Sequence, residues 1–220
     1  MRAARLLLNR RAMQSGARPG TSATSLRGYE VSAILPFADH EDVIGAAVLH
    51  LASHLRELGV SFEILAIDED SGDNSHAVLA LLRAQVPELR VTHAPGRGRG
   101  FDTGIARAQG RVLWLIEPPA AAQPLAAFLR TYEQIRDEAI DAAIVRGRFV
   151  VAHRTRAMSV AAGLRGMGDV YFRRLAKRLG ARGLRLDIQL AGGGPAPVPA
   201  RGLFRRRTSI AARRASAKFI

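Results

Sequence analysis

Cysteine is entirely absent from this 220-residue chain. Disulfide bonds, thiolate metal sites and cysteine nucleophiles are therefore excluded. Long apolar runs are missing as well, because no window approaches the roughly 20 apolar residues that span a bilayer. Hydrophobic residues still make up 48% of the chain, which is enough for the core of a globular domain. We expect a cytoplasmic protein whose contact with a membrane, where it makes one, is peripheral.

Lysine is scarce, since Lys177 and Lys218 are the only two among 33 basic side chains. The formal net charge is +14, and arginine carries almost all of it. A high-GC coding bias gives an arginine-rich and alanine-rich composition of this kind, so part of the charge says little about partners. The functional interpretation is a preference for the phosphates of a nucleotide sugar, a lipid headgroup or nucleic acid.

Acidic residues are missing from both ends of the chain. Residues 1–28 are expected to form a disordered basic arm, and a mitochondrial transit peptide is the alternative. Residues 191–220 begin with glycines and prolines, which predict a linker, and continue as a basic tail. Residues 29–190 remain for a single α/β domain.

The middle of the chain alternates between short apolar runs and amphipathic segments. A strand at 31–35, ended by Pro36, precedes a helix with Asp39 as its N-cap and Gly59 as its stop. This alternation continues and predicts a doubly wound, mainly parallel sheet flanked by helices. The further predicted elements are strands at 62–67, 89–93, 112–116 and 142–145, and helices at 75–85, from the glycine-rich loop to 109, at 125–135 and at 169–179.

Polar groups follow three of the predicted strands at the points where these strands end. Pro36 to Asp39 follow the first strand, Asp68 and Glu69 the second, and Glu117 the fourth. In open α/β sheets ligands bind beyond the carboxyl ends of the strands, so we expect these groups to share one edge and hold a ligand. The alternative for Asp68 and Glu69 is that they are solvated acids of an ordinary turn.

A glycine-rich loop at 94–104 leads into the third predicted helix. Its glycines let backbone amides approach a diphosphate, the helix start favours anions, and Arg97 adds a forked pair of donors. A Rossmann fingerprint is excluded, because the loop follows the third strand and not the first. A nucleic-acid segment of the RGG type would repeat and carry several aromatics, so nucleic acid is not the partner that this loop favours.

These segments resemble the motifs of family 2 glycosyltransferases. The acids after the second strand are similar to the nucleotide-binding turn VVDDGSTDGT, with Asp68, Glu69, Ser71 and Asp73 at matching positions. The resemblance covers residues 31–190 and implies the GT-A fold of nucleotide-diphospho-sugar transferases. It also implies a nucleotide sugar as the ligand, with Asp68 and Glu69 in contact with the base and ribose.

Two more segments carry the resemblance. The first strand resembles VSVVIPxYNE, with Pro36 at the proline, Asp39 at the asparagine and His40 at the glutamate. The glycine-rich loop resembles GKGAALNAGIARARG, with Arg97 at the lysine and Asp102 at the asparagine. These matches imply that Pro36, Asp39, Arg97 and Asp102 take part in binding the nucleotide sugar.

The metal-binding motif of the family is altered in this chain. In the family the fourth strand ends in DxD, where two carboxylates hold Mg²⁺ or Mn²⁺ against the leaving diphosphate. Here the aligned residues are Glu117, Pro118 and Pro119, so Glu117 is the one metal ligand that the resemblance implies. A bound Mg²⁺ would then depend on the diphosphate and water, or arginines would neutralise the leaving group instead.

Two later segments resemble the polyprenyl-phosphate branch of the family. Residues 146–149 are similar to GSRF, with Arg148 at the arginine, and residues 184–189 are similar to LPVRDTQ, with Asp187 and Gln189 at matching positions. The resemblance implies a lipid phosphate acceptor at an anionic membrane surface, near Asp187. Such an acceptor is already an anion, so Asp187 would orient it. The alternative is that Asp187 is a surface acid paired with nearby arginines.

The sequence therefore predicts a glycosyltransferase that moves a hexose, with inversion, from a nucleotide sugar to a polyprenyl phosphate or similar acceptor. The rival is a degenerate, non-catalytic member of the same fold that binds a sugar nucleotide or a protein partner. Three departures from the family pattern favour the rival: Pro119 in place of the second metal carboxylate, His40 in place of the glutamate, and the loss of CGF after Gln189.

Overall fold

The computed structural model describes residues 28–121 and 126–189. The predicted basic arm, apart from Gly28, and the predicted linker and tail lie outside these residues. The described part contains one seven-stranded sheet in the order β3-β2-β1-β4-β6-β5-β7. Its strands are β1 (Val31–Phe37), β2 (Phe62–Asp68), β3 (Leu89–His93), β4 (Val112–Ile116), β5 (Ala142–Val145), β6 (Phe149–His153) and β7 (Leu186–Gln189).

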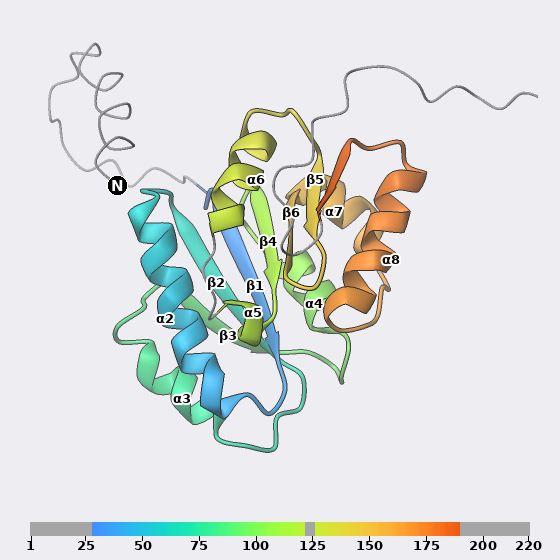
Figure 1. The fold of residues 1–220 in the computed structure, drawn as a ribbon. Helices are drawn as coiled ribbons and strands as arrows, with labels where there is room; N and C mark the ends of the chain where they lie inside the picture. The colour runs from blue at the N-terminus through green and yellow to red at the C-terminus, as the bar shows by residue number, and fades with distance from the viewer. Residues whose placement is uncertain (1–27, 122–125, 190–220) are drawn as a thin grey trace, which may run out of the picture.

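Helices cover both faces of the sheet (Figure 1). One face packs against α2 (Glu41–Glu57), α3 (Ser75–Leu82), α5 (Pro118–Ala121) and α6 (Ala126–Arg136). The other face packs against α4 (Gly100–Arg107), α7 (Arg154–Ala161) and α8 (Gly168–Ala181). Successive residues of β1 alternate between the two cores, because neighbouring side chains of a strand point to opposite faces. The predicted doubly wound α/β sheet is confirmed.

Strand β6 is the one antiparallel member of the sheet described here. It follows β5 after the short turn 146–148, in which Gly147 adopts a positive φ of 68°. So short a connection can join antiparallel strands only, whereas parallel neighbours need a long crossover. The other adjacent pairs are parallel, which brings the carboxyl ends of β1, β2 and β4 to one edge.

The predicted end of the first strand at Pro36 is wrong, because β1 continues to Phe37. The Phe37 carbonyl accepts a hydrogen bond from the Glu69 amide, so the backbone polar groups of Phe37 point toward β2. The backbone nitrogen of Pro36, one residue earlier, therefore points toward the other neighbouring strand, β4. On that side β4 pairs with β1 only as far as Ile34. The missing amide of Pro36 therefore breaks no bond of the sheet.

The prediction that Asp39 caps the first helix is also wrong. Helix α2 begins at Glu41, with His40 at its N-cap and no side-chain cap bond. Asp39 instead has a φ of 55° and turns its carboxylate toward other loops. The predicted stop is confirmed, since the helix ends at Glu57 and Gly59 follows with a φ of 67°.

The buried carboxylate of Glu63 links β2 to its neighbours β1 and β3. Glu63 is fully buried in β2 and accepts hydrogen bonds from the Ser32 hydroxyl and the Gln109 amide, each at 2.7 Å. Its other oxygen pairs with Arg90 at 2.7 Å. The Gly110 amide donates to the same Ser32 hydroxyl at 2.8 Å, which fixes the chain just before β4. This network holds the strands that carry the carboxylates of the edge.

Candidate functional site

Three strands deliver polar groups to one edge of the sheet. Asp68 is the last residue of β2 and pairs in register with Phe37, the last residue of β1. Glu117 comes directly after β4, which is parallel to β1. The sequence-based expectation that these strand ends lie together is confirmed.

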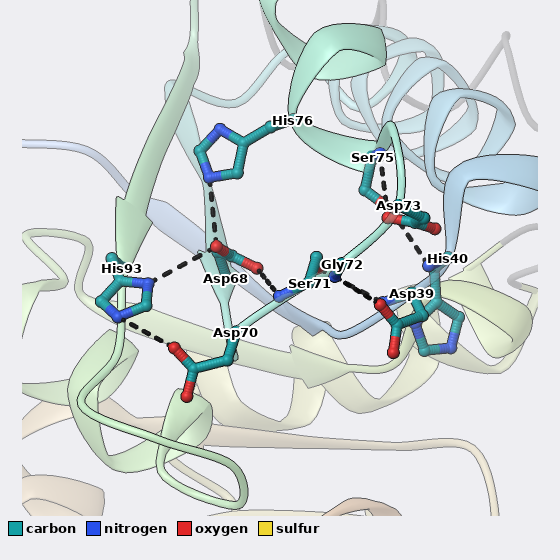
Figure 2. Close-up of polar contacts among 10 residues, drawn as sticks. All are labelled: Asp39, His40, Asp68, Asp70, Ser71, Gly72, Asp73, Ser75, His76 and His93. Atoms are coloured by element: carbon teal, nitrogen blue, oxygen red, sulfur yellow. Dashed lines mark hydrogen bonds and ion pairs between the residues drawn. The ribbon is translucent and has the colours of Figure 1, made fainter.

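Asp68 lies almost buried between two histidines (Figure 2), with 6% of its surface exposed. One carboxylate oxygen accepts the Ser71 amide at 3.0 Å, and the other lies 3.2 Å from His76 Nε2 and 3.4 Å from His93 Nδ1. Burial alone would raise the pKa of Asp68, but the hydrogen bonds from Ser71 and His93 and the nearby His76 bring it below its ordinary value. Asp68 is therefore an ionised acceptor at neutral pH.

Neither His76 nor His93 was predicted as a site residue from the sequence, because nothing in their spacing along the chain links them to Asp68. His93 ends β3 directly beside Asp68 in the parallel register, and its Nε2 also lies 3.3 Å from Asp70. His76 is the second residue of α3. The predicted end of the third strand at residue 93 was the available signal, since adjacent parallel strands end side by side.

The loop after β1, the turn after β2 and the glycine-rich loop are joined through Asp39. Its carboxylate accepts the Gly72 amide at 2.7 Å and pairs with the Arg97 guanidinium at 2.7 Å. Its amide donates to the Ser71 hydroxyl at 3.2 Å (Figure 2). The ion pair brings Arg97 to the carboxylate edge, and the Arg97 side chain stays 62% exposed.

The starts of α2 and α3 are tied to each other by a reciprocal set of hydrogen bonds. The Asp73 carboxylate accepts the amides of Glu41 at 2.9 Å and Ser75 at 3.0 Å. The Glu41 carboxylate accepts the Asn74 amide at 2.7 Å, and the His40 amide donates to the Ser75 hydroxyl at 3.0 Å. Asp73 therefore shapes the turn that presents Asp68.

Glu69 joins β2 to the glycine-rich loop and is only 1% exposed. One of its oxygens accepts the Gly100 amide at the start of α4, and the other is buried with no hydrogen-bond partner among the described residues. Gly100 has no room for a side chain, because a Cβ would lie 2.5 Å from Pro36 Cβ and 2.7 Å from Glu69 Oε1. Pro36 and Glu69 thus set the position of the loop.

Glu117 faces the same group of residues from β4. It accepts a backbone hydrogen bond from Gly168 at the start of α8. Burial raises the pKa of the Glu117 carboxyl, and the negative charge of Glu69 adds to this, whereas the Gly168 bond and the charge of His40 oppose it. This mutual influence places Glu117, Glu69 and His40 in one electrostatic neighbourhood.

The sequence profile of Glycosyl transferase family 2 matches residues 32–198. The chain belongs to this family. The sheet order and flanking helices are those of the GT-A fold of nucleotide-sugar transferases. Among curated protein sequences, none matches the chain.

Solved glycosyltransferases share the fold at low sequence identity. A mannosyltransferase from Pyrobaculum calidifontis, in complex with GDP-Man and Mn²⁺, is 15% identical with a TM-score of 0.59, over 90% of this chain and 66% of that one. Glucosyl-3-phosphoglycerate synthase from Mycobacterium tuberculosis, with Mg²⁺ and UDP, is 17% identical with a TM-score of 0.56, over 79% and 74%. Mannosyl-3-phosphoglycerate synthase from Rubrobacter xylanophilus is 13% identical with a TM-score of 0.56, over 74% and 65%. The family 2 chain thus spans less than two thirds of the mannosyltransferase.

The remaining predicted residues of this family 2 member lie in other parts of the fold. Asp102 is in the first turn of α4 and accepts the Gly163 amide at 3.3 Å. Asp187 and Gln189 belong to β7, where Gln189 donates to the Asp187 carboxylate at 2.7 Å. Five strand spacings separate β7 from β2, or about 24 Å across the sheet. Arg148 lies in the turn between β5 and β6.

The residues that the structure describes do not by themselves make a complete metal site. Among the residues that the structure describes, no group of three or more His, Asp or Glu side chains is arranged to hold a metal ion. Pro118 and Pro119 open α5 directly after Glu117, so the DxD position of the family supplies one carboxylate. In the same described residues, no helix is both long and apolar enough to cross a membrane.

Proposed function

We propose that the chain transfers a hexose from a nucleotide sugar to a polyprenyl phosphate or a similar phosphate acceptor. The observation that carries the proposal is the 2.7 Å ion pair between Arg97 and Asp39, which brings an exposed arginine side chain against the edge that holds Asp68. An ionised carboxylate can accept hydrogen bonds from a nucleoside, and a forked guanidinium can bind a diphosphate. Both requirements of a nucleotide sugar therefore meet at one edge.

The roles at this edge follow from burial and charge. Asp68 is ionised, nearly buried and fixed by three partners, which suits it to accept hydrogen bonds from the base or ribose. Glu69 already accepts the Gly100 amide, so it would act mainly by positioning the loop. Arg97 would exchange Asp39 for the diphosphate when the donor binds, because its side chain is exposed. Helix α4 begins at the same loop and adds its positive end.

A divalent ion would have to arrive with the diphosphate. We propose Glu117 as the protein ligand of Mg²⁺ or Mn²⁺, since Mg²⁺ is commonly held by one or two carboxylates together with substrate phosphates. The ion would supply positive charge for the leaving diphosphate. The unpartnered oxygen of Glu69, which is close enough to influence Glu117, fits a nearby positive charge.

Transfer would break the bond between C1 of the hexose and the diphosphate and form one between C1 and an acceptor phosphate oxygen. A phosphate anion is a nucleophile without a general base, so Asp187 would orient the acceptor. We propose Gln189 and Arg148 as further acceptor contacts. Three strand spacings separate β4 from β7, about 14 Å, which the acceptor and the sugar together would span. A lipid acceptor would place this end of the sheet at an anionic membrane surface.

Calorimetric titration with UDP-sugars and GDP-sugars, with and without Mn²⁺ or Mg²⁺, tests the proposal. We expect binding that Asp68→Asn weakens at least about tenfold, because a hydrogen bond to a charged acceptor contributes about 1.5–3 kcal/mol. Asp70→Asn is the matched control, since Asp70 lies on the same turn and is largely exposed. Lipid extraction after incubation with labelled donor and polyprenyl phosphate measures turnover. Metal-independent binding without turnover would favour a non-catalytic sugar-nucleotide binder.

A further inference from the structure

A basic hollow lies between the end of α7 and the outer side of α8, with a volume of about 540 Å³. Four cationic side chains line it: Arg165, Arg174, Lys177 and Arg178. None of the carboxylates of the sheet edge belongs to its lining. A neighbouring hollow of about 340 Å³ shares Arg178 and adds Arg182. The basic hollow is therefore a separate feature, to which the proposed transfer reaction assigns no role.

These cations are not neutralised by acids. Within residues 28–121 and 126–189, none of the five forms an ion pair, whereas Arg173 on the same helix pairs with Asp169 at 3.2 Å. Asp102 contacts the lining of the hollow, where its carboxylate accepts the Gly163 amide at 3.3 Å and, within the same residues, forms no ion pair with the five cations. Several like charges kept together without counter-charges repel one another and favour an anion between them.

The arginines are held in place by backbone carbonyls. Arg178 donates to the carbonyls of Val160 at 2.8 Å and Ala162 at 3.0 Å, and Arg174 donates to the carbonyl of Arg165. Taken alone, the hydrogen bonds of Arg178 are those of a cation that caps the carboxyl-terminal, negative end of α7. A guanidinium has five N–H donors, however, so both arginines keep donors for a ligand. Lys177 forms no hydrogen bond in the described contacts, and capping does not explain it.

We propose that the basic hollow binds a phosphate monoester, either on a lipid headgroup or on a soluble molecule. The four cations carry more positive charge than one phosphate dianion carries negative charge. A guanidinium held in place can also donate two parallel hydrogen bonds to two oxygens of a phosphate. The volume is larger than a single phosphate needs, which leaves room for the group that carries it. The hollow adjoins the glycine-rich loop, because the Gly166 amide donates to the Gly98 carbonyl at 2.9 Å, but Arg97 is not part of its lining.

Titration of the full chain with inorganic phosphate, and sedimentation with phosphatidic acid vesicles, test the proposal in two arms. The double variant Arg174→Gln with Lys177→Gln should lose about tenfold in affinity, equivalent to about 1.4 kcal/mol. The matched control, Arg83→Gln with Arg130→Gln, removes the same charge from exposed positions on α6 and at the end of α3. Both variants keep the arginine-rich ends, so the difference between them reports on the hollow. An unchanged melting temperature without phosphate shows that each variant folds.

The arms separate the two sources of the phosphate. The proposal is supported if the double variant loses binding of both phosphate and vesicles while the control keeps both. Tighter binding of inorganic phosphate by the unmodified chain then indicates a soluble monoester, and tighter binding of phosphatidic acid vesicles indicates a lipid-borne one. Equal losses in the double variant and the control would overturn the proposal, because net charge would then explain the binding. Loss of phosphate binding in Arg97→Gln alone would also overturn it, since the ion would then bind at the glycine-rich loop.

Discussion

Asp68 and Glu117 lie at the ends of the two strands that flank β1, and their electrostatic surroundings are opposite. Asp68 is almost buried, but its amide and histidine partners more than offset the desolvation of its charge. Burial disfavours the charged form of Glu117 and the negative charge of Glu69 adds to this, which outweighs the hydrogen bond from the Gly168 amide, so the pKa of Glu117 is raised. The edge therefore carries a carboxylate that a cation or an added proton would stabilise.

The effect of Glu117 on stability should depend on pH. Its folded-state pKa is raised by burial, so the folded protein binds the proton more tightly than the unfolded chain. The contribution of Glu117 is therefore favourable at low pH and is lost as the pH rises through the folded-state pKa. We expect Glu117→Gln to raise the melting temperature by a few degrees at pH 7.5, and the gain to shrink toward pH 4. A melting-temperature gain that stays constant between pH 4 and pH 7.5 would contradict a raised folded-state pKa of Glu117.

Single residues also mark where prediction from sequence fails. The strand at 62–67 was predicted as a buried strand, but nothing in its pattern shows that Glu63 lies inside with Ser32 and Arg90 as partners. These partners come from other strands, 31 and 27 residues away. Asp68 and Glu69 were predicted because they follow a strand, whereas His76 and His93 approach them only through the folded register. Contacts across strands are not written in local spacing.

Helix α4 packs against β1 more closely than any side chain would allow. A Cβ on Gly104 would overlap Ile34 Cγ2, so the helix can approach the sheet only with glycine at this position. We expect Gly104→Ala to lower the free energy of unfolding by about 1–3 kcal/mol through overpacking. Chemical denaturation measures the change.

Gly180→Ala is the matched control for Gly104→Ala, because it lies in α8 with its nearest neighbour, Leu186 Cδ1, at 3.7 Å from the added carbon. Alanine favours helix over glycine by about 0.8–1.0 kcal/mol, so the control should be neutral or stabilising. If Gly104→Ala and Gly180→Ala change the free energy of unfolding equally, Gly104 is not in close contact with Ile34 and the prediction is wrong.

Most elements with a strong apolar pattern were predicted, and several other elements were missed. One of the missed elements, β6, is an apolar strand buried between β4 and β5. The strands at 112–116 and 142–145 have the predicted bounds, and the basic helix at 169–179 is α8. Helix α7 escaped prediction because its buried positions are Ala157, Val160 and Ala161, which are small and lie among arginines and serine. Strand β7 escaped because it is a four-residue edge strand with no fully buried residue. Edge and peripheral elements bury little surface, so their patterns are faint.

In the part of the chain that the structure describes, the carboxylates of the sheet edge and the arginines of α8 belong to different regions. The formal net charge is +14, yet the carboxylates Asp39, Asp68, Glu69 and Glu117 gather at one edge of the sheet. The arginines of α8 and of the chain ends lie elsewhere in the sequence. A chain of this charge attracts any polyanion through counterion release, independently of the site at the edge.

Binding of single-stranded oligonucleotide should therefore differ from binding of a nucleotide sugar. A non-specific complex with six to ten phosphate contacts loses about 10³-fold or more in affinity between 50 and 200 mM salt. We expect a gel shift to show a loss of this order, and excess UDP to leave the oligonucleotide in place, because UDP would occupy the carboxylate edge and the oligonucleotide the arginine-rich surface. UDP-sugar binding, with a single diphosphate, should weaken far less over the same range. Displacement of the oligonucleotide by UDP would place nucleic acid at the edge and contradict the assignment of that edge to a sugar donor.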